Sequence, residues 1–425
     1  MKSLLLSSLL FASAALGTRV PGANGKITYD GYKAFRIHTG ENEALVKELV
    51  ESLPEAIKFN MDTAEHLDLV VPPKELKAFE ALNLDSVVIY EDLGADIRAE
   101  GDFATYETTA ARAVPSLTWF NSYHAYADHV TFFNDLAGAF PSNSEIFTVG
   151  QSLQGRDIFG IHLWGSGGKG SKPAVYFHGT VHAREWISAK VVEYVTYQLL
   201  VNYSTDAAVK AILDKYDFYI LPFVNPDGFV YTQTTNRLWR KNRQTRSGSS
   251  CVGTDINRNW PYKWELTNGA STNPCDETYK GQAAGDTPEN KALVAFTKTL
   301  VASKGIKLYI DWHSYGNYIL TPYGYSCSAT PSNNARQLEL ARGLNTRIQQ
   351  SYGTRHTVGG ACSTLYATTG DSTDYLTDVS KAEFAWTIEL RPGSGTSNGF
   401  VLPAAQILPS GVEQWEGMKY LLATM

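Results

Sequence analysis

A histidine and a glutamate three residues apart, His182 and Glu185, follow closely on the apolar run 174–177. The apolar run predicts a buried strand, after which the chain turns into a helix. At such a turn this spacing lets one imidazole nitrogen and one carboxylate converge on a single cation. A catalytic zinc site uses three protein ligands and leaves a fourth position open for water. The motif therefore predicts two zinc ligands at a strand-to-helix turn and requires a third ligand elsewhere.

His313 is the best candidate for the third ligand. It follows the β-rich run 307–312, and site residues of an α/β sheet normally lie at the carboxyl ends of strands. His178, four residues before His182, imitates the helical spacing of two zinc-binding histidines. It stands in the run expected to be a strand, where a four-residue spacing serves no common ligand position. We expect His313 to bind the metal and His178 not to. A His-x-x-Glu pair alone occurs by chance in many chains, so accompanying motifs must support it.

A carboxylate, Glu389, ends the otherwise apolar strand expected at 384–390. Burial raises the pKa of a carboxylate toward neutrality, while a bound metal lowers the pKa of water. Glu389 is therefore a natural general base beside a zinc ion. The alternative is a structural glutamate paired with an arginine such as Arg391.

Arginines and an asparagine stand in two polar segments, with Arg237 and Arg240 in 236–241 and Asn257 and Arg258 in 255–260. The planar guanidinium grips a carboxylate with two hydrogen bonds. An enzyme that recognises a free C-terminal carboxylate needs one such group, and one that forms an oxyanion beside a metal gains from a second. The alternative for each arginine is a solvated or ion-paired surface role.

Taken together, these motifs resemble the secreted zinc metallocarboxypeptidases of the pancreatic carboxypeptidase A and B type, in their zymogen form. The resemblance runs from about residue 33 to the C-terminus, and this family is a standard example of the two-histidine, one-glutamate zinc site. It implies one zinc ion per catalytic domain, bound by His182, Glu185 and His313. It implies that Glu389 is the general base and that Arg240 polarises the scissile carbonyl and holds its oxyanion.

The resemblance also implies where substrate binds. The terminal carboxylate would be held by Asn257, Arg258 and Tyr366, and the subsites on the amino side of the scissile bond would be lined by Arg184, Ser314 and Tyr315. Asp255 suits the role of hydrogen-bond acceptor for a ligand imidazole. The family pairing of the cysteines would be Cys251 with Cys275 and Cys327 with Cys362.

The residue at the floor of the specificity pocket departs from the family patterns. That floor is aliphatic in enzymes that prefer apolar C-terminal residues and aspartate in those that prefer Lys or Arg. Here the corresponding position is Thr373, and Thr387 also matches the neutral-pocket enzymes. We predict a carboxypeptidase A-like preference for apolar or aromatic residues. A one-residue shift in alignment would bring in Asp371 or Asp374 and give a carboxypeptidase B-like preference for Lys or Arg.

The chain is long enough for two domains, since 425 residues exceed one typical domain. A first domain is indicated by the pattern strand 34–37, helix 43–53, strand 57–60, strand 67–71, helix 74–82 and strand 87–90. This order is a ferredoxin-like βαββαβ unit and resembles the family's activation domain, an inhibitory cap. A polar connector expected to be helical follows at 94–112, with Arg112 as a processing site.

The later chain alternates apolar strands and helical stretches, which predicts an α/β fold with a mixed, largely parallel sheet covered by helices on both faces. The expected organisation is a signal peptide at 1–17, an activation propeptide at 18–112 and a zinc carboxypeptidase catalytic domain at 113–425. The signal peptide rests on an apolar stretch after Lys2 that is too short for a membrane span.

Secretion also agrees with the even number of cysteines and with a glycosylation sequon at Asn202. The net charge of −6 without a basic cluster argues against nucleic acid as a partner, and no later run predicts a membrane span. The expected partners are peptide or protein C-termini, the chain's own propeptide as inhibitor and an activating protease.

Two other functions fit parts of this pattern. One is a hydrolase of the same fold that acts on N-acyl amino acids, which also carry a free carboxylate. The other is a non-catalytic relative that binds peptides without cutting them. Loss of a zinc ligand or of the general base would mark the second, and His182, Glu185, His313 and Glu389 are all present.

Overall fold

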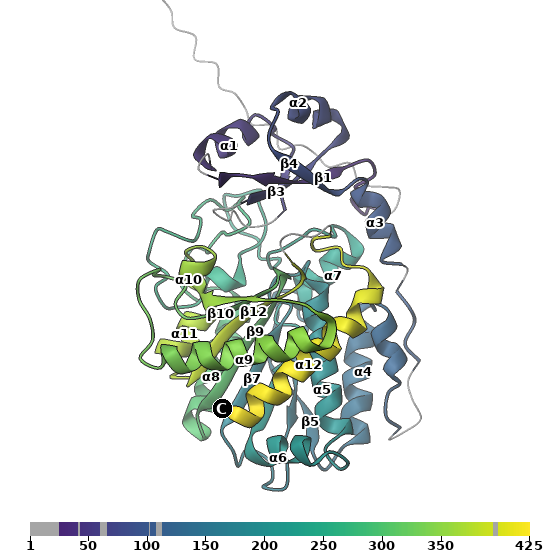
Figure 1. Cartoon of the computed structure of the whole chain (residues 1–425), viewed down its shortest axis with the longest axis vertical. Helices are drawn as coiled ribbons and strands as arrows, with labels where there is room; N and C mark the ends of the chain where they lie inside the picture. Colours follow the sequence, from purple (N-terminus) through teal and green to yellow (C-terminus); the bar gives the residue numbers. More distant parts are fainter. Residues whose placement is uncertain (1–24, 41–42, 60–65, 102, 108–112, 394–397) are drawn as a thin grey trace, which may run out of the picture.

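The computed structural model describes residues 25–40, 43–59, 66–101, 103–107, 113–393 and 398–425. A small N-terminal domain sits over one end of a large domain (Figure 1). The expected signal peptide at 1–17 and the expected cleavage site Arg112 lie outside the described residues. Among the helices that are described, none is long and apolar enough to cross a membrane.

The N-terminal domain is an antiparallel sheet of four strands in the order β2-β3-β1-β4, with two helices on its outer face (Figure 1). Its elements are β1 (Lys33–His38), α1 (Glu43–Val50), β2 (Ile57–Lys58), β3 (His66–Val71), α2 (Leu76–Ala81) and β4 (Ser86–Tyr90). This order and pairing confirm the ferredoxin-like prediction.

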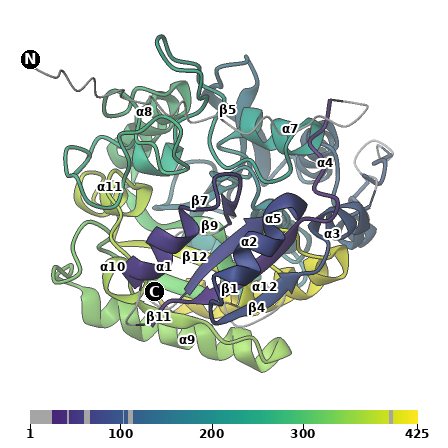
Figure 2. The ribbon, with the colours of Figure 1, turned by 90° about the horizontal axis from the view of Figure 1, so that it is seen from above.

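Strand β3 has two faces with different partners, because successive side chains of a strand point to opposite sides. Leu67, Leu69 and Val71 join the core under the helices. Asp68 and Val70 point the other way, where Val70 joins an apolar cluster shared with the large domain. The inner face of the small sheet is thus an interface with the large domain. Seen from above, the small domain lies over the end of the large domain's central strands (Figure 2).

The large domain is built on eight strands in the order β11-β10-β12-β9-β7-β8-β6-β5. Strands β12, β9, β7 and β8 are parallel to one another, and antiparallel pairs occur between β10 and β12, β6 and β8, and β5 and β6. The strands are β5 (Ser144–Gln151), β6 (Asp157–Leu163), β7 (Ala174–Gly179), β8 (Asp217–Leu221), β9 (Ile306–Gly316), β10 (Tyr318–Thr321), β11 (Thr357–Gly360) and β12 (Phe384–Gly393). The mixed, largely parallel sheet confirms the predicted α/β fold.

Helices cover both faces of this sheet (Figure 1). They are α4 (Tyr126–Ala139), α5 (Trp186–Val201), α6 (Ala207–Lys215), α7 (Pro226–Thr234), α8 (Pro288–Ser303), α9 (Asn334–Tyr352), α10 (Ala361–Thr364), α11 (Ser372–Asp378) and α12 (Ile407–Thr424). Strand β7 is buried along its whole length: Val175 and Phe177 face one apolar cluster, and Ala174 and Tyr176 face another. Burial on both faces explains why this strand is a continuous apolar run.

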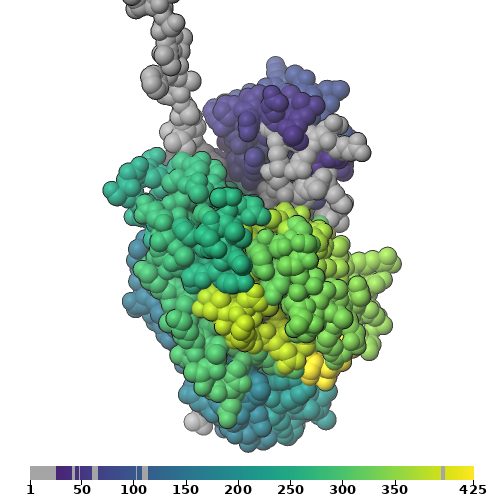
Figure 3. Space-filling model, turned by 90° about the vertical axis from the view of Figure 1, so that its left-hand side faces the viewer, coloured from purple at the N-terminus to yellow at the C-terminus, as the bar shows by residue number. Residues whose placement is uncertain are grey.

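Within its described residues the connector is helical only at its start, so the helix predicted over 94–112 does not extend through residues 103–107; residues 108–112 lie outside the described residues. Helix α3 (Leu93–Ala99) begins at Asp92, whose side chain accepts a hydrogen bond from the Ala95 amide. Just beyond the helix, Gly101 adopts a left-handed conformation with φ of 86°, which ends helices. Residues 103–107 then run without helix, and the rings of Phe103 and Tyr106 contact those of Trp186 and Trp119 in the large domain. The space-filling view shows the small domain seated directly on the large one (Figure 3).

Two disulfides close loops of the large domain, Cys251–Cys275 and Cys327–Cys362. These are the pairs that the family resemblance implies. The first loop carries polar site residues between its cysteines, and the second joins the loop after β10 to α10.

Candidate active site

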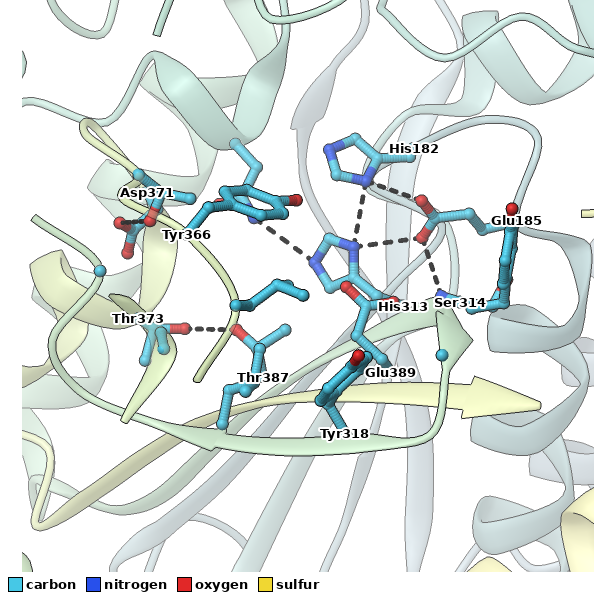
Figure 4. Close-up of a pocket in the computed structure, with 18 of the residues that line it drawn as sticks. His182, Glu185, His313, Ser314, Tyr318, Tyr366, Asp371, Thr373, Thr387 and Glu389 are labelled. Carbon is cyan, nitrogen blue, oxygen red and sulfur yellow. Dashed lines mark hydrogen bonds and ion pairs between the residues drawn. The ribbon is translucent and has the colours of Figure 1, made fainter. Parts of the chain in front are cut away.

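Three buried side chains meet at the carboxyl end of the central strands. His182 and Glu185 lie in the turn between β7 and α5, with Glu185 immediately before the helix, and His313 lies on β9 (Figure 4). His182 Nδ1 is 2.9 Å from Glu185 Oε1, and His313 Nδ1 is 3.0 Å from His182 Nδ1 and 3.1 Å from Glu185 Oε2. Two imidazole nitrogens and a carboxylate that point at one position form a donor set suited to zinc.

Each histidine of this triad has a carboxylate behind it. His182 Nε2 is 3.2 Å from Asp255 Oδ1, and His313 Nε2 is 3.1 Å from Asp311 Oδ2. An acceptor on the far nitrogen fixes the tautomer, so that the near nitrogen presents its lone pair. The contact of Asp255 agrees with the role expected for it. The sequence reasoning missed Asp311, although the Asp-x-His spacing on a strand places both side chains on one face.

His178 lies in β7 and belongs to a different environment. Its Nδ1 is 2.9 Å from the Tyr309 hydroxyl, and its Nε2 contacts the Tyr176 hydroxyl. Burial lowers the pKa of His178 to about 4, so the ring stays neutral among these tyrosines. The structure therefore gives His178 two protein partners away from the triad.

Glu389 lies beside the triad and lines the same cavity. Its Oε2 is buried without a hydrogen-bond partner among the described residues. Arg391, the partner considered in the structural alternative, instead pairs with Glu413, with Nε donating to Oε1 over 2.7 Å. Burial raises the pKa of Glu389 to about 8, and Glu185 adds to this while His313 opposes it. A carboxylate with one buried oxygen left without a hydrogen-bond partner among the described residues and with a raised pKa is suited to act as a proton acceptor near neutral pH.

Arg240 and Arg237 come from one segment but face different partners. Arg240 lines the cavity, and its Nε and Nη2 donate to Asp255 Oδ2 over 3.1 and 2.9 Å. Asp255 therefore holds Arg240 and His182 at once. Arg237 donates instead to both carboxylate oxygens of Glu100, each over 2.7 Å, and so faces the connector.

The residues expected at a substrate carboxylate also line this cavity: Asn257, Arg258 and Tyr366. Arg258 is held by donation from Nε to the Gly269 carbonyl and from Nη1 to the Asn257 carbonyl, each over 2.8 Å. Burial raises the pKa of Tyr366 to about 12, so its phenol remains a neutral donor. Two neutral donors and a fixed cation form a suitable site for an anion.

Next to these donors the cavity has a mixed side-chain pocket. The hydroxyls of Thr373 and Thr387 are 2.9 Å apart, and both residues line the cavity (Figure 4). Asp371 lines it as well. Apolar atoms come from Leu320, Ala361 and Leu365. Thr373, Thr387 and Asp371, all three considered for the specificity pocket, thus line the same cavity as the triad.

Of the three residues expected on the amino side of the scissile bond, two line the cavity and one does not. Ser314 and Tyr315 line it, but Arg184 does not. The Arg184 guanidinium lies 4.2 Å from the centre of the Phe400 ring, and its Nη1 donates to Glu277 Oε2 over 3.1 Å. Arg184 thus borders the site, packed against Phe400. Phe400 lies in the loop before α12, and the sequence motifs did not reveal that it would be a neighbour of Arg184.

The N-terminal domain reaches this same region. His66 of β3 lines the cavity, and the Tyr315 hydroxyl donates to the Asp68 carboxylate. Phe59 is fully buried, with its ring centre 5.1 Å from that of Phe400 and 6.3 Å from that of Tyr315. The small domain therefore covers the part of the cavity lined by Tyr315 and Phe400. Sequence patterns placed the domain but could not identify these contacts.

The fold and the site are those of a metallohydrolase, with two histidines and a glutamate placed to hold a zinc ion. Residues 129–417 match the model of the zinc carboxypeptidase family. The chain is 45% identical to a metallocarboxypeptidase A-like protein of Trichophyton verrucosum, over 100% of both chains. It therefore belongs to the zinc carboxypeptidase family. It is a zinc metallocarboxypeptidase, a hydrolase that acts on peptide C-termini.

Solved structures agree with this assignment. The carboxypeptidase A of Helicoverpa armigera is 26% identical, with a TM-score of 0.79, and the match covers 93% of this chain and 98% of that one. Thrombin activatable fibrinolysis inhibitor is 25% identical, with a TM-score of 0.82, and the match covers 92% of this chain and 97% of that one. Both comparisons extend over the small and the large domain.

Proposed function

We propose that this enzyme removes single residues from the C-termini of peptides and proteins, with Glu389 as general base. One observation carries the proposal: the metal triad, the free carboxylate of Glu389 and the anion site at Arg258 line a single cavity. An exopeptidase needs this combination, because the terminal carboxylate must be held at a fixed distance from the bond that is cut.

His182, Glu185 and His313 would hold the zinc ion. When bound, zinc lowers the pKa of water and polarises a carbonyl. Glu389 accepts the proton of the attacking water and passes it to the leaving amine. Arg240, fixed by Asp255, donates to the carbonyl oxygen as negative charge develops there.

The terminal carboxylate of the substrate would be bound by Arg258, Asn257 and Tyr366. We test this with peptide pairs that differ only in a free or an amidated C-terminus, using the proteolytically activated enzyme. Amidation removes the charge that Arg258 pairs with, so cleavage should fall about 100-fold or more. Equal rates on both peptides would contradict exopeptidase action. N-acyl amino acids, assayed in parallel, test the alternative function: they should be cleaved more slowly than peptides that also fill the Tyr315 side.

We propose that apolar or aromatic C-terminal residues are preferred. Leu320, Ala361 and Leu365 supply an apolar wall, and the hydroxyls of Thr373 and Thr387 share a hydrogen bond with each other. A carboxypeptidase B-like preference for Lys or Arg is the alternative, and Asp371 is the residue in its favour.

We also propose that residues 18–112 are an inhibitory propeptide, that 1–17 are a signal peptide for secretion and that cleavage after Arg112 leaves 113–425 as the mature enzyme. The contacts of Asp68 with Tyr315 and of Phe59 with Phe400 support a cap over the amino-side subsites. The uncut precursor should be nearly inactive on a small peptide, and trypsin should release activity. Sequencing the new N-terminus would locate the cut.

A further inference from the structure

The carboxylate of Asp371 is held in one orientation at the wall of the side-chain pocket (Figure 4). Its Oδ1 accepts a hydrogen bond from the Asp374 amide over 2.8 Å, as the cap of helix α11. Its Oδ2 accepts from the Thr368 hydroxyl, also over 2.8 Å. A carboxylate oxygen has two lone pairs, so each oxygen keeps acceptor capacity. The group is positioned by its neighbours and can still bind a donor.

A second carboxylate, Asp374, lies behind the first. It accepts hydrogen bonds from the Gly324 and Tyr325 amides over 3.0 and 2.9 Å. The charged or titratable groups that face Asp371 are Asp374 from its own helix, Arg258 from the turn at 256–258 and Tyr309 from β9. The hydrogen bonds of Arg258 go to carbonyl groups, and within the described residues no ion pair joins it to Asp371.

We infer that Asp371 is a specificity-determining residue that lets the side-chain pocket accept a C-terminal Lys or Arg in addition to apolar residues. The inference rests on the proposed function, because it concerns the last residue of the same peptide substrates. A cationic side chain buried without a partner is strongly disfavoured, whereas a positioned carboxylate compensates for its lost hydration. An apolar side chain would pack on Leu320 and Leu365 instead.

The pair of carboxylates can adapt to both kinds of side chain. Burial raises the pKa of Asp371, and burial together with Asp371 raises the pKa of Asp374 well above its ordinary value. With an apolar side chain bound, a proton on the pair removes an uncompensated charge. A cationic side chain takes the place of this proton. Binding of Lys or Arg therefore releases a proton and is favoured as the pH rises through the raised pKa.

The test compares three peptides that differ only in the last residue: arginine, its neutral isostere citrulline, and phenylalanine. The secreted chain is first activated by limited proteolysis until it cleaves the phenylalanine peptide. If Asp371 pairs with the cation, kcat/KM should be about tenfold or more higher for arginine than for citrulline. The ratio should fall as the pH is lowered through the raised pKa of the pair, since protonation removes the attraction.

Asp371→Asn keeps the size and the helix-capping ability of the side chain, because asparagine is also a good N-cap. It should bring the arginine-to-citrulline ratio close to one. The matched control is Asp378→Asn at the other end of α11, where Asp378 accepts from the Tyr323 hydroxyl over 2.8 Å. This variant should keep the ratio of the unsubstituted enzyme. Zinc content and Tm show that both variants fold.

These measurements test the role of Asp371 separately from the proposed exopeptidase activity. Equal rates on arginine and citrulline in the unsubstituted enzyme would overturn the role of Asp371, whether or not a variant folds. An unchanged ratio in Asp371→Asn would overturn it as well. Failure to cleave the phenylalanine peptide after proteolysis would instead count against the proposed exopeptidase function.

Discussion

Glu389 and His313 are direct neighbours in the sheet, because β12 pairs in parallel with β9 and the register sets these two residues opposite each other. The proposed general base and a metal ligand are thus fixed by backbone pairing, without a flexible loop between them. Sites on regular elements hold their geometry more precisely than sites on loops. This relationship suggests substitutions that separate metal binding from proton transfer.

Glu389→Gln should fold and bind zinc but lose activity. The amide keeps the shape of the carboxylate and cannot accept the proton, and general bases contribute about 100-fold or more to turnover. We would measure kcat on a phenylalanine-ended peptide together with zinc content by atomic absorption. Retention of more than about a tenth of the activity would contradict the assignment.

His313→Ala should lose zinc to a chelator, whereas His178→Ala should retain it. Only His313 faces His182 and Glu185; His178 is bound to Tyr309 and Tyr176. Both variants remove a buried imidazole, so Tm serves as the common measure of destabilisation. Equal zinc content in the two proteins after dialysis would show that the wrong histidine has been chosen.

Asp68→Asn should raise the residual activity of the uncut precursor. The Asp68 carboxylate is paired with Arg36 through Nη2 at 2.7 Å and also accepts from the Tyr315 hydroxyl, so an amide weakens both contacts. Glu80→Gln on the exposed surface of α2 is the matched control. A separately expressed segment from Gly17 to Arg112 should inhibit the cut enzyme in trans. Full activity of the uncut, unsubstituted precursor would refute the cap.

Peptides that end in Phe or Leu should be cleaved faster than those that end in Lys or Arg. An aromatic ring gains from leaving water, whereas a cation must give up its hydration even where Asp371 receives it. Measured kcat/KM for matched peptides at neutral pH decides the order. A rate for Lys or Arg equal to that for Phe would place the enzyme with the basic-residue class.

The predicted elements and site residues followed from patterns that depend on local chemistry. The apolar run of β7 and the turn motif after it located His182 and Glu185, and the strand before His313 located the third ligand. Contacts between distant segments lacked such a signal. The contact between Asp311 and His313 Nε2 could have been predicted from strand periodicity alone. The contact between Arg184 and Phe400 could not, because it depends on how the loop before α12 folds back over the site.

In the connector, tertiary packing overrode the helix that the local sequence predicted. A polar stretch with few breakers favours a helix, yet α3 ends at Ala99 because Gly101 turns the backbone and the next residues pack on the large domain. Packing of Phe103 and Tyr106 on tryptophans outweighs the weak preference of a short helix. Tertiary contacts of this kind are not visible in local sequence.

The two faces of strand β3 link the stability of the small domain to the inhibition that we propose for it. Leu67 and Leu69 hold the domain together from one side of the strand, while Asp68 holds Tyr315 from the other. A displacement of the strand by one residue would exchange these two faces and remove the contact with Tyr315. Heat, denaturant or a protease that opens the small domain would also unblock the site. Precursor activity should therefore report directly on the melting of that domain.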